Sequence, residues 1–476
     1  MKFKWLILIT AMMALVLPVH ADIDFAPFFS VDTDIHGQSR IRVLGPLFEF
    51  KSSETNKSVW ALRPLTSFAE HGYDNKTERD VLWPLWTGKT FNDEYSWQCV
   101  LLVRWQDFDV TDPESRYRFW ALPFYFQGRS AKGEDYKAVF PLGGEIQEFI
   151  GRDSIKFVMF PIYTYTTIND VETVSYIWPI FARTTGHGHD RFRAFPIYGY
   201  ARLREDFMKK FILWPFWTSA EYNYAGANGS AFILFPFYGE TKMENQEAKM
   251  YLPPFFKFAR SEDQGAILCL WPFYQRKWNQ HKDQLDIWPL YGSKQQGHLN
   301  NKYFLWPIVR TEKAEYDNRE LNSFSLIPLI ESKTKVIKNS EEPEDDYVEG
   351  RFFKLWPLFS YSRSNDDLQF KTFRLWPFKD FDPIERNYAP FWTLYSHTRQ
   401  GDIVEDELLW GLFQHRRGGV NGRKISLFPF FSVGKNDINE TLEWDFLKGL
   451  FGYKRNSSGK RVKLLYLFSF GSAGAD

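Results

Sequence analysis

Three copies of one short pattern follow one another between residues 175 and 217, in the sequence SYIWPIFARTTGHGHDRFRAFPIYGYARLREDFMKKFILWPFW. In each copy, large apolar side chains flank a proline, at Pro179, Pro196 and Pro215. Polar and glycine-rich residues separate the copies. The pattern recurs along the chain every 17 to 21 residues or so, giving on the order of 23 copies. Such a repeat predicts an array of similar units rather than several unrelated domains.

The copies extend almost from one end of the chain to the other. Clear copies also centre on Pro84, Pro123, Pro161, Pro236, Pro254, Pro272, Pro289, Pro307, Pro328, Pro357, Pro377 and Pro429. Weaker copies centre on Pro27, Pro46, Pro64, Pro141 and Pro390, and glycine replaces the proline at Gly411 and Gly449. The widest gap, between Pro328 and Pro357, contains the acidic run 341–346, which we interpret as a surface loop within an insertion at 331–350.

Turn-forming residues between the copies define what one repeat contains. A period of about 19 residues has room for one strand of about 10 to 12 residues and one turn. Short connections favour antiparallel neighbours, so we expect an all-β fold, an antiparallel meander of about 20 or more strands. Proline removes a donor from a strand, and we interpret each one as a bulge at the strand centre. The alternative is two short strands in each period, separated at the proline.

Two architectures remain open for this meander. A large β-barrel, which could be flattened, agrees with the strand length and the aromatic content. The ending Leu464–Phe470 resembles the aromatic last strand of outer-membrane barrels, although Gly471–Asp476 follows it. A soluble β-repeat array, solenoid or propeller-like, agrees better with an apolar centre of about five residues, or roughly 16 Å, because barrels show an apolar band of about 25 Å. The barrel is our expectation and the array the alternative.

The first 21 residues have the order of a secretory signal peptide. Lys2 and Lys4 precede an apolar run, Trp5–Leu17, and the small-residue exit ends at Ala21. We therefore expect export, with residues 22–476 forming a single β-repeat domain. The outer membrane is the expected location, and the periplasm or cell surface the alternative.

Composition limits the partners. The chain has 59 basic and 59 acidic residues, so no basic surface for nucleic acid is expected. Aromatic residues make up 19% of the chain, which suits strands that pack aromatic side chains. The pairing of the only two cysteines, Cys99 and Cys269, stays open.

No nucleophile elbow, phosphate loop, dinucleotide fingerprint or haem motif occurs, and we expect no cofactor or metal and no catalytic residues. His187-Gly188-His189-Asp190 has metal-binding atoms, but it lies in a glycine-rich stretch and is interpreted as a loop. The Trp-Pro-aromatic units are expected to form the continuous core of the repeats. Several arginines fall on the same strand face as each proline, whereas Lys354 and Arg374 break this rule. The candidate ligand-facing residues are Arg183, Arg202, Arg260, Arg276, Arg363, Trp217 and Tyr238.

Three classes of function follow from these patterns. The first is a non-catalytic structural or transport component of the outer membrane. The second is a periplasmic or surface β-repeat protein that binds glycan or lipid, through the aromatic and arginine side chains. The third, a glycan-acting enzyme, is the least supported. Outer-membrane lipid or envelope glycan is the expected partner.

Overall fold

The computed structural model describes residues 23–33, 38–52, 57–72, 75–338, 347–419, 422–436, 440–465 and 468–471. The expected signal peptide and the acidic run 341–346 lie outside these residues. The chain divides into two compact units, one formed by Met1–Pro84 with Val348–Asp476 (unit 1) and the other by Leu85–Tyr347 (unit 2). No described helix is long and apolar enough to cross a membrane.

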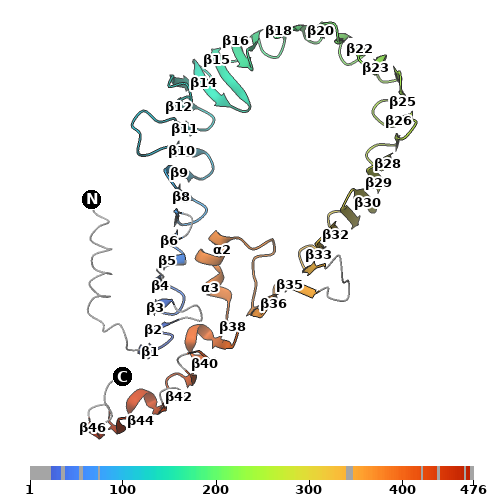
Figure 1. The fold of residues 1–476 in the computed structure, drawn as a ribbon. Helices are drawn as coiled ribbons and strands as arrows, with labels where there is room; N and C mark the ends of the chain where they lie inside the picture. The colour runs from blue at the N-terminus through green and yellow to red at the C-terminus, as the bar shows by residue number, and fades with distance from the viewer. Residues whose placement is uncertain are drawn as a thin grey trace. The chain divides into compact units, whose positions relative to one another are not determined.

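Unit 2 consists of short strands that follow one another in chain order (Figure 1). They are β8 (Trp86–Phe91), β9 (Glu94–Cys99), β10 (Val103–Asp107), β11 (Tyr117–Ala121), β12 (Tyr125–Arg129), β13 (Asp135–Val139), β14 (Gly143–Phe149), β15 (Arg152–Val158), β16 (Tyr163–Ile168), β17 (Val171–Tyr176), β18 (Phe181–Gly186), β19 (His189–Ala194), β20 (Tyr198–Leu203), β21 (Phe207–Ile212), β22 (Trp217–Tyr224), β23 (Ala227–Leu234), β24 (Tyr238–Met243), β25 (Gln246–Tyr251), β26 (Phe256–Ser261), β27 (Gly265–Cys269), β28 (Tyr274–Asn279), β29 (Lys282–Ile287), β30 (Tyr291–Gln296), β31 (Leu299–Phe304), β32 (Val309–Tyr316), β33 (Arg319–Leu326) and β34 (Ile330–Ile337).

Unit 1 contains the first strands, the last strands and two short helices. Its strands are β1 (Ile23–Phe25), β2 (Phe29–Thr33), β3 (Ser39–Val43), β4 (Phe48–Ser52), β5 (Lys57–Leu62), β6 (Thr66–His71), β7 (Lys76–Val81), β35 (Tyr347–Leu355), β36 (Phe359–Ser364), β37 (Asp367–Thr372), β38 (Tyr395–Gln400), β39 (Ile403–Leu408), β40 (Phe413–Arg417), β41 (Arg423–Leu427), β42 (Phe431–Asn436), β43 (Thr441–Phe446), β44 (Phe451–Asn456), β45 (Gly459–Leu464) and β46 (Phe468–Gly471). The helices are α2 (Asp382–Asn387) and α3 (Ala389–Trp392).

The all-β antiparallel meander is confirmed, because the strands pair antiparallel with their neighbours in the chain. The described strands form an open sheet, since β1 pairs only with β2 and β46 only with β45. The open sheet corresponds to the repeat array that we gave as the alternative, and not to a closed barrel. The expected insertion is shorter than 331–350, because β34 extends to Ile337 and β35 begins at Tyr347. Cys99 and Cys269 form no disulfide.

Except for Pro377 and Pro390, each proline of the repeat lies in a turn, so our interpretation of the prolines as mid-strand bulges is wrong. Pro179 separates β17 from β18, and the Trp178–Pro179 peptide bond is cis. The amide of Ile180 donates to the carbonyl of Ile177 at 2.8 Å and closes the turn. A turn accepts proline because no ladder donor is needed there. One period therefore holds two strands, mostly of six residues, and two turns.

These Pro turns all lie along one long edge of the sheet, which we call the Pro edge. In unit 2 it comprises the twelve turns at Pro123, Pro141, Pro161, Pro179, Pro196, Pro215, Pro236, Pro254, Pro272, Pro289, Pro307 and Pro328. Hydrogen bonds join successive turns, for example from the Trp178 amide to the Pro161 carbonyl and from the Trp214 amide to the Pro196 carbonyl, both at 2.7 Å. The opposite edge, the polar edge, carries turns such as 169–170 and 187–188.

The two faces of unit 2 differ in side-chain size. One face, the aromatic face, carries a large residue at the Pro-edge end of most strands, as the register Tyr163↔Tyr176↔Phe181 shows. The other, the small-residue face, carries Ser175, Gly199 or Gly292 at the adjacent position. Its buried apolar side chains gather on β12–β15, at Phe126, Tyr136, Ala138, Ile146 and Phe157. Side-chain alternation along each strand keeps the two sets apart.

Glycine on the small-residue face makes room for rings from the next strand. A Cβ atom at Gly292 would overlap the ring of Tyr303, whose hydroxyl donates to Asp286 at 3.1 Å. We predict that Gly292→Ala lowers the free energy of unfolding by about 1 to 3 kcal/mol through overpacking. Urea unfolding of Gly292→Ala in the wild-type and Tyr303→Ala backgrounds measures this effect. An equal loss in both backgrounds would exclude the Tyr303 ring as its cause.

Candidate functional site

Large apolar side chains are exposed at every Pro turn of unit 2. The residue after each proline is Phe124, Leu142, Ile162, Ile180, Ile197, Phe216, Phe237, Phe255, Phe273, Leu290, Ile308 or Leu329. Their exposed fractions range from 37% at Ile180 to 66% at Phe237. We call these twelve side chains the apolar tips. Our expectation that the Trp-Pro-aromatic units form a buried core is therefore wrong, because the chain reverses at the proline and leaves them at the edge of the sheet.

Aromatic side chains before the prolines stack from one turn to the next. The ring centroids of Phe160 and Trp178 are 5.6 Å apart, and those of Phe195 and Trp214 are 5.3 Å apart. Trp178 and Trp214 nevertheless remain about half exposed. Since neighbouring turns are also joined by backbone hydrogen bonds, the Pro edge forms a continuous apolar border rather than a set of separate side chains.

The chemistry changes in a fixed order from the Pro edge inward. After most tips, the aromatic face begins with an aromatic residue such as Tyr198, Trp217 or Tyr238, whereas Gly143, Val309 and Ile330 follow the other three. Trp217 and Tyr238 are linked through Phe232, with centroid distances of 5.7 Å and 5.8 Å. Charged residues follow further along the strand, as Arg202 does on β20. Apolar, aromatic and charged side chains thus form successive zones.

The predicted arginines of unit 2 lie in the charged zone of the aromatic face, on separate strands. Arg183, Arg202, Arg260 and Arg276 belong to β18, β20, β26 and β28 of unit 2, and Arg363 belongs to β36 of unit 1. Most of them have local partners. Arg183 forms a 2.8 Å ion pair with Asp190, Arg276 lies over the Trp278 ring, and Arg202 and Arg363 each donate to a carbonyl two residues on.

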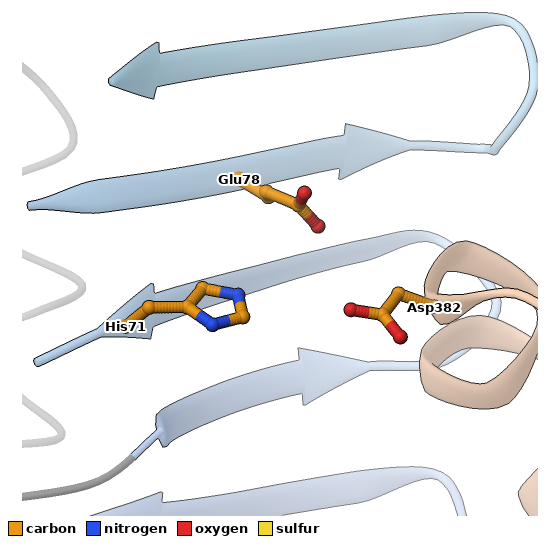
Figure 2. Close-up of side chains that lie close together, drawn as sticks. All are labelled: His71, Glu78 and Asp382. Atoms are coloured by element: carbon orange, nitrogen blue, oxygen red, sulfur yellow. The ribbon is translucent and has the colours of Figure 1, made fainter. Parts of the chain in front are cut away.

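A second candidate lies inside unit 1, where α2 contacts β6. Figure 2 shows His71 on β6, Glu78 on β7 and Asp382 at the start of α2, with their side chains directed toward one another. One potential ligand atom from each lies within 4.8 Å of the others. Glu78 also accepts a hydrogen bond from Arg386 at 2.9 Å and pairs with Lys76 at 2.9 Å. Burial raises the pKa of Glu78, but the hydrogen bonds from Lys76 and Arg386 outweigh this effect and lower it to about 2.

Electrostatics favour a structural role for this cluster over metal binding. The cations Arg386 and Lys76 already neutralise Glu78, so a divalent ion there would meet two positive charges at close range. Arg386 also pairs with Asp80 and donates to the Ser67 hydroxyl at 3.0 Å. The cluster therefore attaches α2 to β6 and β7 by buried ion pairs.

Further buried ion pairs occur elsewhere in unit 1. Arg40 pairs with Asp32 at 2.7 Å and with Glu405 at 3.1 Å, which joins β3 to β39. Lys354 is only 2% exposed and pairs with Asp380 at 2.9 Å. Arg374 pairs with Asp380 and with Glu385. These contacts explain why Lys354 and Arg374 break the sequence rule, since both bury their charge against the segment that contains α2.

Sequence reasoning missed this segment. Pro377 and Pro390 match the repeat, but Pro390 lies inside α3 and neither forms a turn between strands. The available signal was Pro383 directly after Asp382, because proline is favoured in the first turn of a helix. Where glycine replaces the proline, at Gly411 and Gly449, short 3-10 turns (Leu409–Gly411 and Leu447–Gly449) connect the strands.

Removing Arg386 should destabilise unit 1 strongly. We predict that Arg386→Ala lowers the free energy of unfolding by about 3 to 5 kcal/mol, because it leaves Glu78 and Asp80 buried without their main cation. Arg310→Ala is the matched control, since it breaks an exposed pair with Glu312 and should cost less than about 1 kcal/mol. Urea unfolding compares the two variants. Equal losses would contradict the role of Arg386.

The pKa of Glu78 predicts a loss of stability in acid. Its ordinary value is 4.5 and its value in the fold is about 2, so folding favours the ionised form. The resulting stabilisation, about 3 kcal/mol, is complete above pH 4.5 and is lost as the pH falls to about 2. In urea unfolding at several pH values, wild type should exceed Glu78→Gln in stability near neutral pH and approach it in acid. A difference independent of pH would contradict the prediction.

Comparison with known proteins gives no family for this chain. No family model matches it, and no curated protein matches it. The function therefore has to be inferred from the residues and their geometry.

Proposed function

We propose that this protein is a non-catalytic, exported cell-envelope protein whose open β-repeat sheet binds the surface of a lipid bilayer through its Pro edge. The observation that carries the proposal is the exposure of an apolar tip at each of the twelve Pro turns of unit 2. Soluble proteins rarely expose continuous apolar surface of this kind without a partner.

The order of side chains points to lipid as that partner. A bilayer changes from hydrocarbon, through an interface that favours Trp and Tyr, to water. The strands follow the same order, with an apolar tip such as Ile197, then Tyr198, and then Arg202. A protein partner would have no need for this sequence of zones in most of the repeats.

The depth of the apolar zone suits attachment at the surface. The tip, the aromatic residue before the proline and the first residue of the next strand extend over roughly 10 Å, at about 3.3 Å per residue. Interfacial proteins bury their apolar face to about 5 to 10 Å, whereas the hydrocarbon core is about 30 Å thick. The proposed mode is therefore shallow insertion of the Pro edge.

Energetics agree with this mode because the contacts are repeated. Full burial of a side chain such as Ile or Phe is worth about 1.5 to 3 kcal/mol, so a half-exposed tip contributes about 1 kcal/mol. One tip alone would not hold the protein at a bilayer. Twelve tips supply on the order of 10 kcal/mol, which is comparable to the cost of association.

The N-terminal pattern supports the envelope location. A positive start, an apolar run and a small-residue exit would direct the chain across the inner membrane. Lipid of the outer membrane is then the expected partner. The polar edge, at the other end of the same strands, would face water.

Vesicle flotation tests the proposal. We expect the wild-type chain to float with phosphatidylcholine vesicles, and the triple variant Phe216→Glu, Phe237→Glu, Phe255→Glu to lose most of this binding, because it places charge at three neighbouring tips. The matched control is Ile150→Glu, Tyr224→Glu, Leu299→Glu, which alters exposed apolar residues at the polar edge.

Two outcomes would overturn the proposal. The first is wild-type protein that stays at the bottom of the gradient. The second is equal loss of binding in both triple variants, which would show that the Pro edge is not the contact surface. Sedimentation of the same samples tests whether the Pro edge instead binds a second copy of the chain. If the wild type does not float and self-associates, and only the Pro-edge variant is monomeric, the tips bind a second copy of the chain.

A further inference from the structure

The polar edge of unit 2 holds a depression on the small-residue face of β16–β19, with Arg152 from the start of β15 at its side. Its volume is about 420 Å³. The lining comes from the strands and from the turns 169–170 and 187–188, and its polar members are Arg152, Asn169, Thr173, Thr184, His187, His189 and Arg191. The stretch that the sequence analysis interpreted as a plain loop, His187–Asp190, contributes two of these side chains.

The charged side chains that line the depression, Arg152 and Arg191, are both positive. Arg152 and Arg191 form no salt bridge with any described residue, unlike Arg183, which pairs with Asp190. Two carboxylates lie at the rim. Asp170 pairs with the exposed His187 at 3.5 Å, and Asp153 accepts the backbone amide of Asn169 at 2.6 Å. Neither of the two arginines that line the depression is therefore paired with a described carboxylate.

A hydrogen bond from Arg191 determines which ring nitrogen of His189 carries the proton. An Arg191 guanidinium nitrogen lies 3.1 Å from Nδ1 of His189. Because a guanidinium can only donate, Nδ1 must accept, and the proton of the neutral ring lies on Nε2. Burial and the neighbouring charge of Arg191 lower the pKa of His189, which keeps the ring neutral at pH 7. His189 thus offers an N–H donor.

Two hydroxyls complete the set. The Oγ1 atoms of Thr173 and Thr184 lie 2.9 Å apart, on neighbouring strands and on the same face as His189 and Arg191. Each hydroxyl can donate one hydrogen bond and accept two, so the pair has capacity beyond its mutual contact. The depression therefore combines two guanidinium groups, an imidazole N–H and two hydroxyls.

We propose that this depression binds the phosphate group of a soluble sugar phosphate. Two arginines without a carboxylate partner favour an anion with more than one charge, and a phosphate monoester carries about −1.5 to −2 at pH 7, with three strong acceptor oxygens. Arginine also matches the geometry of phosphate with two parallel hydrogen bonds. The hydroxyls and Asn169 offer hydrogen bonds to sugar hydroxyl groups, and the volume exceeds what one phosphate needs.

The position within the sheet favours a soluble source over a lipid headgroup. The depression lies at the polar edge, at the opposite end of the same strands from the Pro turns at Pro161, Pro179 and Pro196. Six strand residues extend over roughly 20 Å. A bilayer that receives the Pro edge would leave the depression in water above it. The phosphate site itself does not rest on the proposed membrane attachment.

Isothermal titration of the full mature chain with inorganic phosphate and with a hexose phosphate tests the site. We expect both to bind, the hexose phosphate more tightly, and the double variant Arg152→Gln, Arg191→Gln to weaken binding by about tenfold or more. Arg183→Gln with Arg202→Gln is the matched control, because it removes two arginines of nearby strands that do not line the depression. It should leave the affinity unchanged.

A conservative variant separates charge from geometry. Arg191→Lys keeps the positive charge and loses the guanidinium fork, so it should bind more tightly than Arg191→Gln and less tightly than wild type. A thermal unfolding curve for each variant shows whether it is folded. A charge-removing variant that unfolds is replaced by Thr184→Val, which should weaken hexose phosphate binding.

Several results would overturn the site. These are no heat with either phosphate, equal loss in the control variant, or equal competition by chloride at the same ionic strength. Vesicles identify the source of the phosphate. Stronger flotation with phosphatidic acid than with phosphatidylcholine alone, lost in Arg152→Gln, Arg191→Gln, would contradict the soluble ligand and assign the site to a lipid headgroup. Flotation that is equal with both vesicles supports the soluble ligand.

Discussion

Backbone hydrogen bonding between consecutive antiparallel strands is the interaction on which the rest of the structure depends. Strands of unit 2 contact chiefly their neighbours in the chain, so each strand is stabilised locally, as in other repeat proteins. The Pro turns extend this ladder, because the residue before one proline donates to a carbonyl of the preceding Pro turn, as Trp178 does to Pro161 and Phe195 does to Ile180. Because consecutive strands run in opposite directions, all Pro turns of unit 2 lie on the Pro edge and most other turns lie on the polar edge. The separation of an apolar edge from a polar edge follows from that regularity.

The two units bury different kinds of side chain. In unit 2, β12–β15 bury Phe126 and Phe157 on the small-residue face, and further along this face Thr173, Thr184 and Arg191 line a depression. In unit 1, ion pairs such as Arg40 with Glu405 and Arg386 with Glu78 join elements that are distant in sequence. Buried ion pairs add little net stability compared with apolar packing, but breaking one is costly. Their effect in unit 1 is therefore to specify which segments meet.

The sequence predicted the repeat, the all-β class and the antiparallel meander, because turn signals and apolar periodicity are local properties. It did not decide whether the proline lies within one strand or in a turn between two strands. A period of about 19 residues fits one long strand or two short ones, and the residues around Pro179 alternate equally well in both. The exposure of the tips was missed for the same reason. The α2 segment was not predicted, because Pro377 and Pro390 match the repeat locally. Lys354 and Arg374 lie on the strand face that was expected to be apolar. Their partners, Asp380 and Glu385, come from the α2 segment, which the sequence did not reveal.

Repetition turns weak local features into strong collective ones. A single tip such as Ile197 contributes about 1 kcal/mol on burial, which is less than the cost of immobilising a protein at a surface. Successive tips are held at fixed spacing by the turn-to-turn hydrogen bonds, so once one tip is buried the next need not be brought in from solution. The phosphate site has the opposite character, because His187, His189 and Arg191 belong to one repeat only. A sheet built this way can therefore carry a general attachment surface along one edge and a specific site at one point of the other.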